Sequence, residues 1–195
     1  TYKSAWFMTH RIREAMKPAG GGLLGPGGGI VEADETYWGN NDKQPKGARG
    51  YQHKMKVVSL VERGGEKRSV VVNAVNAKTL RVVLDANVSK DAHLMTDEHS
   101  GYTKIGREFA SHGVTSHSQG QYVDGDNHSN TVESSFSLLK RGLIGTFHHV
   151  GEQHLQRYVT EFDFRWNTRT KAGFTDKQRA EELLRGVAGK RLRYN

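Results

Sequence analysis

The chain has 195 residues and no cysteine, so disulfide bonds and thiolate zinc sites are excluded within it. No stretch reaches about 18 consecutive apolar residues, which excludes a membrane-spanning helix, and no segment has the pattern of a signal peptide. The formal net charge of +8 favours nucleic acid as a partner, although a merely soluble basic protein has the same composition.

The first part of the chain predicts a helix, a glycine-rich linker and a β-hairpin. Apolar residues recur at helical spacing over residues 4–16, and residues 17–29 are rich in glycine. Residues 30–37 predict a strand. Two valine-rich runs, 55–62 and 67–75, flank a Gly-Gly pair, which is the sequence signal of a β-hairpin.

The remaining elements are mostly helices. Apolar stripes at helical spacing indicate the helices, and one short apolar run that ends on an acid indicates a further strand. The predicted helices cover residues 77–88, 99–111, 130–142, 151–167 and part of 176–186, and the strand covers 93–97. A hairpin followed by this alternation predicts an α/β fold, a mixed sheet flanked by helices.

Three acids occupy positions where α/β proteins gather their ligand sites. Asp34 lies inside the first predicted strand, Asp97 ends a later strand, and Glu133 is close to the start of the helix 130–142. Carboxylate oxygens are the ligands that Mg²⁺ prefers, and two such ions can hold both the attacking and the leaving oxygen of a phosphodiester. The pattern indicates a metal site for phosphoryl transfer.

Each acid also has a structural interpretation. Asp97 is suited to start a turn or cap a helix. Asn130 and Glu133 have the spacing of a capping box. Asp34 stands in the string Glu-Ala-Asp-Glu, so any of these acids is open to being an ordinary solvated carboxylate. Asp is depleted in strands, which makes this last interpretation weakest for Asp34.

Four strings resemble the catalytic domain of bacterial insertion-sequence transposases: VEADETYWG, HLMTDEHSGY, YVDGDNHSNTVESSFSLLKRGLIGTFHHV and HLQRYVTEFDFRWNTR. The branch they resemble has an RNase H-like core, a DDE triad with a following lysine, and an upstream zinc ribbon. The resemblance covers about residues 5–170, and 35 residues separate Asp97 from Glu133. It implies three parts: an N-terminal helix and linker (1–29), an RNase H-like catalytic domain (30–170) and a charged tail (171–195).

The resemblance also implies roles for single residues. Asp34, Asp97 and Glu133 become the catalytic metal ligands, for Mg²⁺ or Mn²⁺ and for two ions. Lys140, about 10 Å further along the same helix face, becomes a contact to DNA near the cleaved bond. The full set of expected DNA-binding residues is Lys140, Arg141, His128, Asn130, Lys54 and Arg165. A solvated charge for Lys140 and a plain helix cap for His128 and Asn130 remain open.

The implied partners are double-stranded transposon ends and target DNA, bound by a homo-oligomer. We expect a cytoplasmic, nucleoid-associated protein, and a zinc ribbon upstream of Thr1. Three hypotheses of function follow: an active transposase that cleaves and joins strands, an RNase H-like nuclease that only hydrolyses, and a non-catalytic DNA-binding derivative. Strand-joining assays separate the first two.

Overall fold

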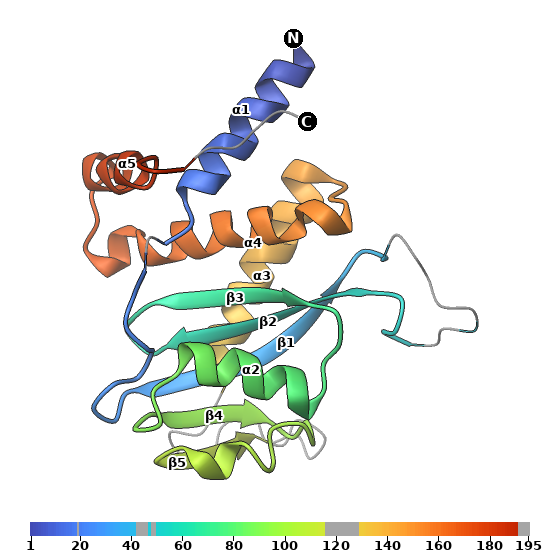
Figure 1. Ribbon diagram of the computed structural model, residues 1–195, viewed down its shortest axis with the longest axis vertical. Helices are drawn as coiled ribbons and strands as arrows, with labels where there is room; N and C mark the ends of the chain where they lie inside the picture. Colours follow the sequence, from blue (N-terminus) through green and yellow to red (C-terminus); the bar gives the residue numbers. More distant parts are fainter. Residues whose placement is uncertain (19, 42–46, 48–49, 116–128, 191–195) are drawn as a thin grey trace.

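The computed structural model describes residues 1–18, 20–41, 47, 50–115 and 129–190. One five-stranded sheet forms its centre, with α2 (Ala77–Asn87) on one face and α3 (Asn130–Gly142) and α4 (Glu152–Asn167) on the other (Figure 1). This arrangement confirms the predicted α/β class, and it is consistent with an RNase H-like fold.

The sheet has the strand order β3-β2-β1-β4-β5. Pairing is antiparallel in the hairpin and across β1 and β2, and it is parallel between β1 and β4 and between β4 and β5. The strands are β1 (Ile30–Trp38), β2 (Met55–Glu62), β3 (Lys67–Val72), β4 (His93–Asp97) and β5 (Ser111–Thr115). β1 is the central strand of the sheet, and β4 lies between it and the edge strand β5.

The two faces of the sheet have separate hydrophobic cores, and alternate side chains of β2 belong to one core or the other. Val58 and Leu60 join Leu80 of α2 in one core. Val57 points the other way and joins Leu139 of α3. Side chains alternate along a strand, so a run such as MKVVSLVE becomes buried on both faces when it lies inside a covered sheet.

Two further helices pack outside the sheet. α1 (Tyr2–Ala15) contacts α4 and α5 (Asp176–Arg185), and Figure 1 shows α1 standing over α4. Between α1 and β1, Leu24 is fully buried and forms a parallel bridge with Val88, so this part of the glycine-rich loop is fixed on the core. Gly25 has φ +69° and a Cβ there would lie 2.6 Å from that of Ala92, which requires glycine.

The predicted helix over 99–111 is wrong. This segment contains turns, a short 3-10 helix (Gly106–Glu108) and the start of β5. Tyr102, Ile105 and Phe109 do enter the core at helical spacing, which explains the misleading pattern. The edge strand β5 was missed because its sequence carries almost no apolar signal, and its Val114 is 48% exposed.

The other predicted helices and strands are confirmed to within a few residues. Within the described part of the chain, none of the helices has the length and apolar character needed to cross a membrane.

Candidate metal centre

The register of the sheet places Asp34 beside Asp97. β1 and β4 run parallel with Ala33 opposite Thr96, so the next residue on each strand is one of the two acids. Neighbouring strands lie about 4.8 Å apart, and residues at equivalent positions point to the same side. The expected meeting of these two acids is therefore explained by strand pairing alone.

Glu35 is the third member of this acidic group. One carboxylate oxygen each from Asp34, Glu35 and Asp97 lies within 4.8 Å of the others, close enough to share a metal ion. The Glu35 side chain is only 6% exposed. The Tyr102 hydroxyl donates a hydrogen bond to its Oε2 at 3.2 Å, and the His99 ring nitrogen Nε2 lies 4.0 Å from Oε1.

Two backbone amides hold the aspartates in place. The Glu35 N–H donates to Oδ1 of Asp34 at 2.7 Å, and the His99 N–H donates to Oδ1 of Asp97 at 3.0 Å. Each bond uses only one carboxylate oxygen, so the second oxygen of each acid remains available as a ligand.

The electrostatics of the group disfavour three negative charges. Burial, with the neighbouring Asp97 as the next cause, raises the pKa of Asp34 to about 8. The pKa of Glu35 is also raised, by burial first and then by Asp97. Among the described residues, no Lys or Arg forms an ion pair with these acids. A divalent cation would relieve both the burial cost and the repulsion.

Glu133 approaches the group from α3 but is not a member of it. Its charge is one of the causes that raise the pKa of Asp34, so the two carboxylates face a common region. The Ser129 hydroxyl donates a hydrogen bond of 2.8 Å to Oε1 of Glu133. The structure thus brings Asp34 and Asp97 together and leaves Glu133 at a longer separation, with Glu35 in the closer position.

The alternative interpretations of these acids are wrong in two respects. α3 has Ser129 as its N-cap, without a side-chain cap hydrogen bond, so Asn130 and Glu133 do not form a capping box. The two glutamates beside Asp34 are not solvated acids, because the side chain of Glu32 is 0% exposed and that of Glu35 is nearly as buried.

The expected DNA-binding residues are spread over several elements. Asn130, Lys140 and Arg141 are exposed on α3. The Lys54 ammonium donates a hydrogen bond to Asn40, and Arg165 forms an ion pair with Glu161 on α4. His128 lies outside the described residues.

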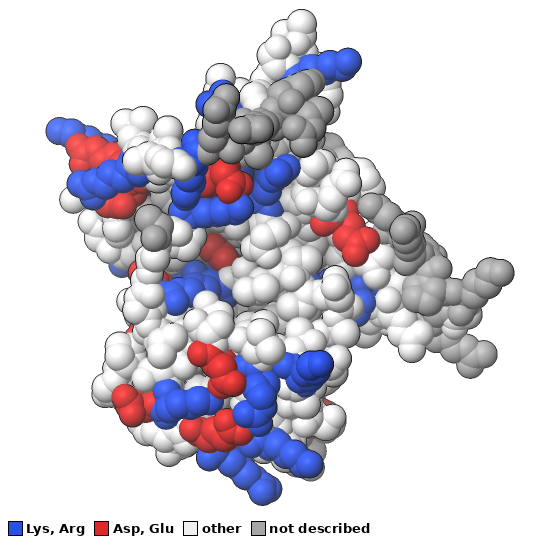
Figure 2. Space-filling view, in the orientation of Figure 1, with Lys and Arg blue, Asp and Glu red and all other residues white. Residues whose placement is uncertain are grey.

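The surface charge on one face of the molecule is mixed. Figure 2 shows Lys and Arg gathered around α2 with acids between them, and Arg81 and Lys90 there both pair with Glu108. Among the described residues, this face therefore has no continuous basic surface of the kind that tracks a phosphate backbone.

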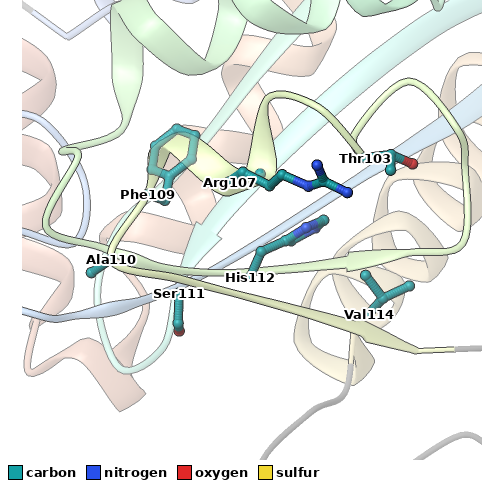
Figure 3. Close-up of a pocket in the computed structure, with 8 residues that line it drawn as sticks. Thr103, Arg107, Phe109, Ala110, Ser111, His112 and Val114 are labelled. Carbon is teal, nitrogen blue, oxygen red and sulfur yellow. The ribbon is translucent and has the colours of Figure 1, made fainter.

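A hollow of about 490 Å³ lies between the 3-10 segment and β5 (Figure 3). Arg107 and His112 line it, and Nε2 of His112 is 2.9 Å from the Thr96 hydroxyl. No Asp or Glu lines the hollow, so it lacks the ligands of a hard cation and is separate from the acidic group.

Comparison with known families now bears on this geometry. The model of the ISXO2-like transposase domain matches residues 26–167, which is most of the chain. The chain belongs to this family of insertion-sequence transposases. The matched range contains every element of the sheet and the acidic group.

A curated relative supports the assignment. The chain is 28% identical over 189 residues to an uncharacterized protein in transposable element ISH50 from Halobacterium salinarum, covering 89% of this chain and 63% of the relative. The chain thus spans somewhat under two thirds of that relative's length. The resemblance to insertion-sequence transposases is confirmed, while the upstream zinc ribbon stays a prediction.

Sequence reasoning did not assign a role to Glu35 or to Tyr102. The adjacency of Asp34 and Glu35 was visible, but neighbours in a strand point to opposite faces and are not expected to share a ligand. The folded structure shows the three carboxylates within 4.8 Å of one another, and it shows that the Tyr102 hydroxyl, 67 positions away, holds Glu35.

Proposed function

We propose that this transposase domain catalyses metal-dependent cleavage of DNA at transposon ends and transfer of the freed strand into target DNA. The observation that carries the proposal is the acidic group at β1 and β4, half-buried and without a paired Lys or Arg among the described residues. Its place within the matched transposase range supports the reaction class.

The chemistry of the donors fits Mg²⁺ or Mn²⁺. All candidate ligands are carboxylates, which hard divalent cations prefer, and a pair of ions would be shared by Asp34 and Asp97 with Glu133 as a further ligand. A bound cation supplies Lewis-acid activation of water or of a 3′-hydroxyl and stabilises charge on the phosphate.

The protein residues have positioning roles in this scheme. Asp34 and Asp97 are fixed by backbone amides and would hold the metal that orients the reacting groups beside β1 and β4. Lys140 is exposed on the same helix as Glu133, two turns further along, and its ammonium binds a DNA phosphate near the cleaved bond. No side chain acts as a covalent nucleophile, so catalysis rests on orientation and charge.

DNA recognition by this domain is mainly electrostatic in the proposal. The net charge of +8 supplies salt-dependent affinity for phosphates, and Arg141, Asn130, Lys54 and Arg165 add contacts to DNA. Paired transposon ends would be held by two or more copies of the chain.

The test is cleavage and strand joining on labelled duplex DNA with Mg²⁺ or Mn²⁺, comparing wild type with Glu133→Gln. The proposal predicts metal-dependent joined products in wild type and their loss in the variant, with DNA binding retained. Cleavage without joining would support the nuclease hypothesis. DNA binding without any metal-dependent reaction would overturn the proposal and leave a non-catalytic DNA-binding protein.

A further inference from the structure

We infer that Glu32 is a positioning residue that anchors the first turn of α3 to β1 and so sets the approach of Glu133 to the two aspartates. The inference rests on the proposed function, because it concerns the same metal site. Its direct evidence is a set of contacts between residues about 100 positions apart in the chain.

The Glu32 carboxylate occupies the start of α3. Oε2 accepts hydrogen bonds from the backbone N–H groups of Thr131 at 2.8 Å and Val132 at 3.0 Å. Oε1 accepts from the Thr131 hydroxyl at 2.8 Å. The first amides of a helix have no partner within the helix, so a strand side chain satisfies them here in place of a local cap.

Arg63 completes the anchor from the end of β2. Its Nε donates to Oε1 of Glu32 at 2.7 Å, and the side chains are 18% and 0% exposed. Arg63 neutralises a carboxylate that is fully buried, and the positive end of the helix dipole favours the same negative charge. Strand, hairpin and helix are therefore tied at one carboxylate.

The anchor can position Glu133 because it joins a residue near Asp34 to a residue next to Glu133. Glu32 and Asp34 are two residues apart on β1, so they point to the same face of the sheet at about 7 Å separation. On α3, Glu133 directly follows Val132, whose amide is bound by Glu32. A helix turn held at Glu32 thus carries Glu133 toward Asp34, and a shift of that turn would move Glu133 with it.

The carboxylate is needed in its charged form. Glu32 accepts at least four hydrogen bonds, two on each carboxylate oxygen. A glutamine would replace one of these oxygens by an NH₂ group, which cannot accept the two hydrogen bonds on that side. Glu32→Gln therefore keeps the volume of the side chain while breaking half of the anchor.

The test uses the full chain and compares wild type, Glu32→Gln and Glu161→Gln. Glu161 is a matched control, because its carboxylate is also buried and paired with two arginines, Arg13 and Arg165, but lies on α4. Two readouts are measured: Mn²⁺ affinity by calorimetry, and amide hydrogen exchange at Thr131 and Val132 by NMR.

For Glu32→Gln we expect Mn²⁺ affinity to fall roughly 10–100-fold, as for other residues that support metal ligands, together with faster exchange of both amides. Glu161→Gln should leave both readouts at wild-type values. Faster exchange with unchanged affinity, or an equal loss of affinity in the two variants, would overturn the positioning role. If the wild-type chain bound no Mn²⁺, the proposed function would fail and the positioning role with it. Unchanged exchange at Thr131 and Val132 in Glu32→Gln would overturn the anchor itself, whatever the metal affinity.

Discussion

Two buried acidic regions of this molecule differ in how their charge is balanced. On α4, Asp163 lies 3.2 Å from the Lys67 ammonium, and Glu161 pairs with Arg13 at 2.8 Å. Asp34 in the middle of β1 and Asp97 at the end of β4 lie together without such a partner among the described residues. The contrast separates acids whose charge a partner within the chain neutralises from acids whose repulsion a bound cation would relieve under the proposed function.

The balanced region predicts the largest change in stability. In Lys67→Met, Asp163 loses the cation that lowers its pKa and remains a buried carboxylate, so the free energy of unfolding should fall by about 3–5 kcal/mol. Urea denaturation at neutral pH measures this. The double variant with Asp163→Leu removes both charges and should recover most of the loss. A fall below about 1 kcal/mol in the single variant would show that the pair is not structurally important.

At the acidic group of Asp34 and Asp97, removing a charge is expected to raise the free energy of unfolding instead of lowering it. The pKa of Asp34 is raised from 3.8 to about 8, so the folded chain retains a proton that the unfolded chain releases, and the stability falls as the pH rises from about 4 to about 8. Asp34→Asn should therefore raise the free energy of unfolding by about 1 kcal/mol or more, while Mn²⁺ affinity falls by at least about 100-fold.

Thermal melts without metal and calorimetry with Mn²⁺ give the two quantities. Asp91→Asn, which changes an exposed acid on the loop before β4, is the control and should alter neither. A less stable Asp34→Asn chain would mean that this acid is part of the balanced framework after all.

A buried base gives a smaller, pH-dependent effect. His10 is 0% exposed, and neither ring nitrogen has a hydrogen-bond partner among the described residues. Burial, then the charges of Arg13, His154 and Arg157, lowers its pKa to about 4. The unfolded chain binds this proton below about pH 6.5, so the stability that depends on neutral His10 is present above that pH and is lost as the pH falls through about 4.

The measurement is the melting temperature of wild type and His10→Phe between about pH 7 and about pH 4.5. Phenylalanine cannot be protonated, so the melting temperature of the variant should fall less than that of wild type as the pH falls. A constant difference across that range would exclude His10 as the source of acid sensitivity where α1 packs on α4.

The smallest effect is expected at an exposed ion pair. Arg81 and Glu108 form hydrogen bonds with each other, but their side chains are 46% and 40% exposed. Solvent screens such pairs, so Arg81→Ala should melt at the wild-type temperature within error. A clear drop would show that ion pairs stabilise this fold even without burial, which would weaken the contrast between the two regions.

The central strands could be predicted from the sequence because side-chain alternation and turn residues, which define them, are close together in the chain. Alternation in β2 and β3 with the Gly-Gly turn indicates the hairpin. The short apolar run 93–97 indicates a strand that ends on Asp97. Glu35 and Glu32 could not be assigned in this way, because their roles depend on Tyr102 and on the first turn of α3, both distant in the chain. The edge strand β5 was missed for a related reason, since backbone pairing to β4 rather than apolar side chains defines it.

The central claim is that Asp34, Asp97 and Glu133 are the metal ligands of this transposase domain. Crystals soaked in Mn²⁺ and measured at the manganese absorption edge test it most directly. If these three acids are the ligands, anomalous peaks are expected at coordination distance, about 2.0–2.2 Å, from oxygens of Asp34 and Asp97, with Glu133 among the ligands. A single peak ligated by Asp34, Glu35 and Asp97 without Glu133, or no peak beside Asp34 and Asp97, would contradict it.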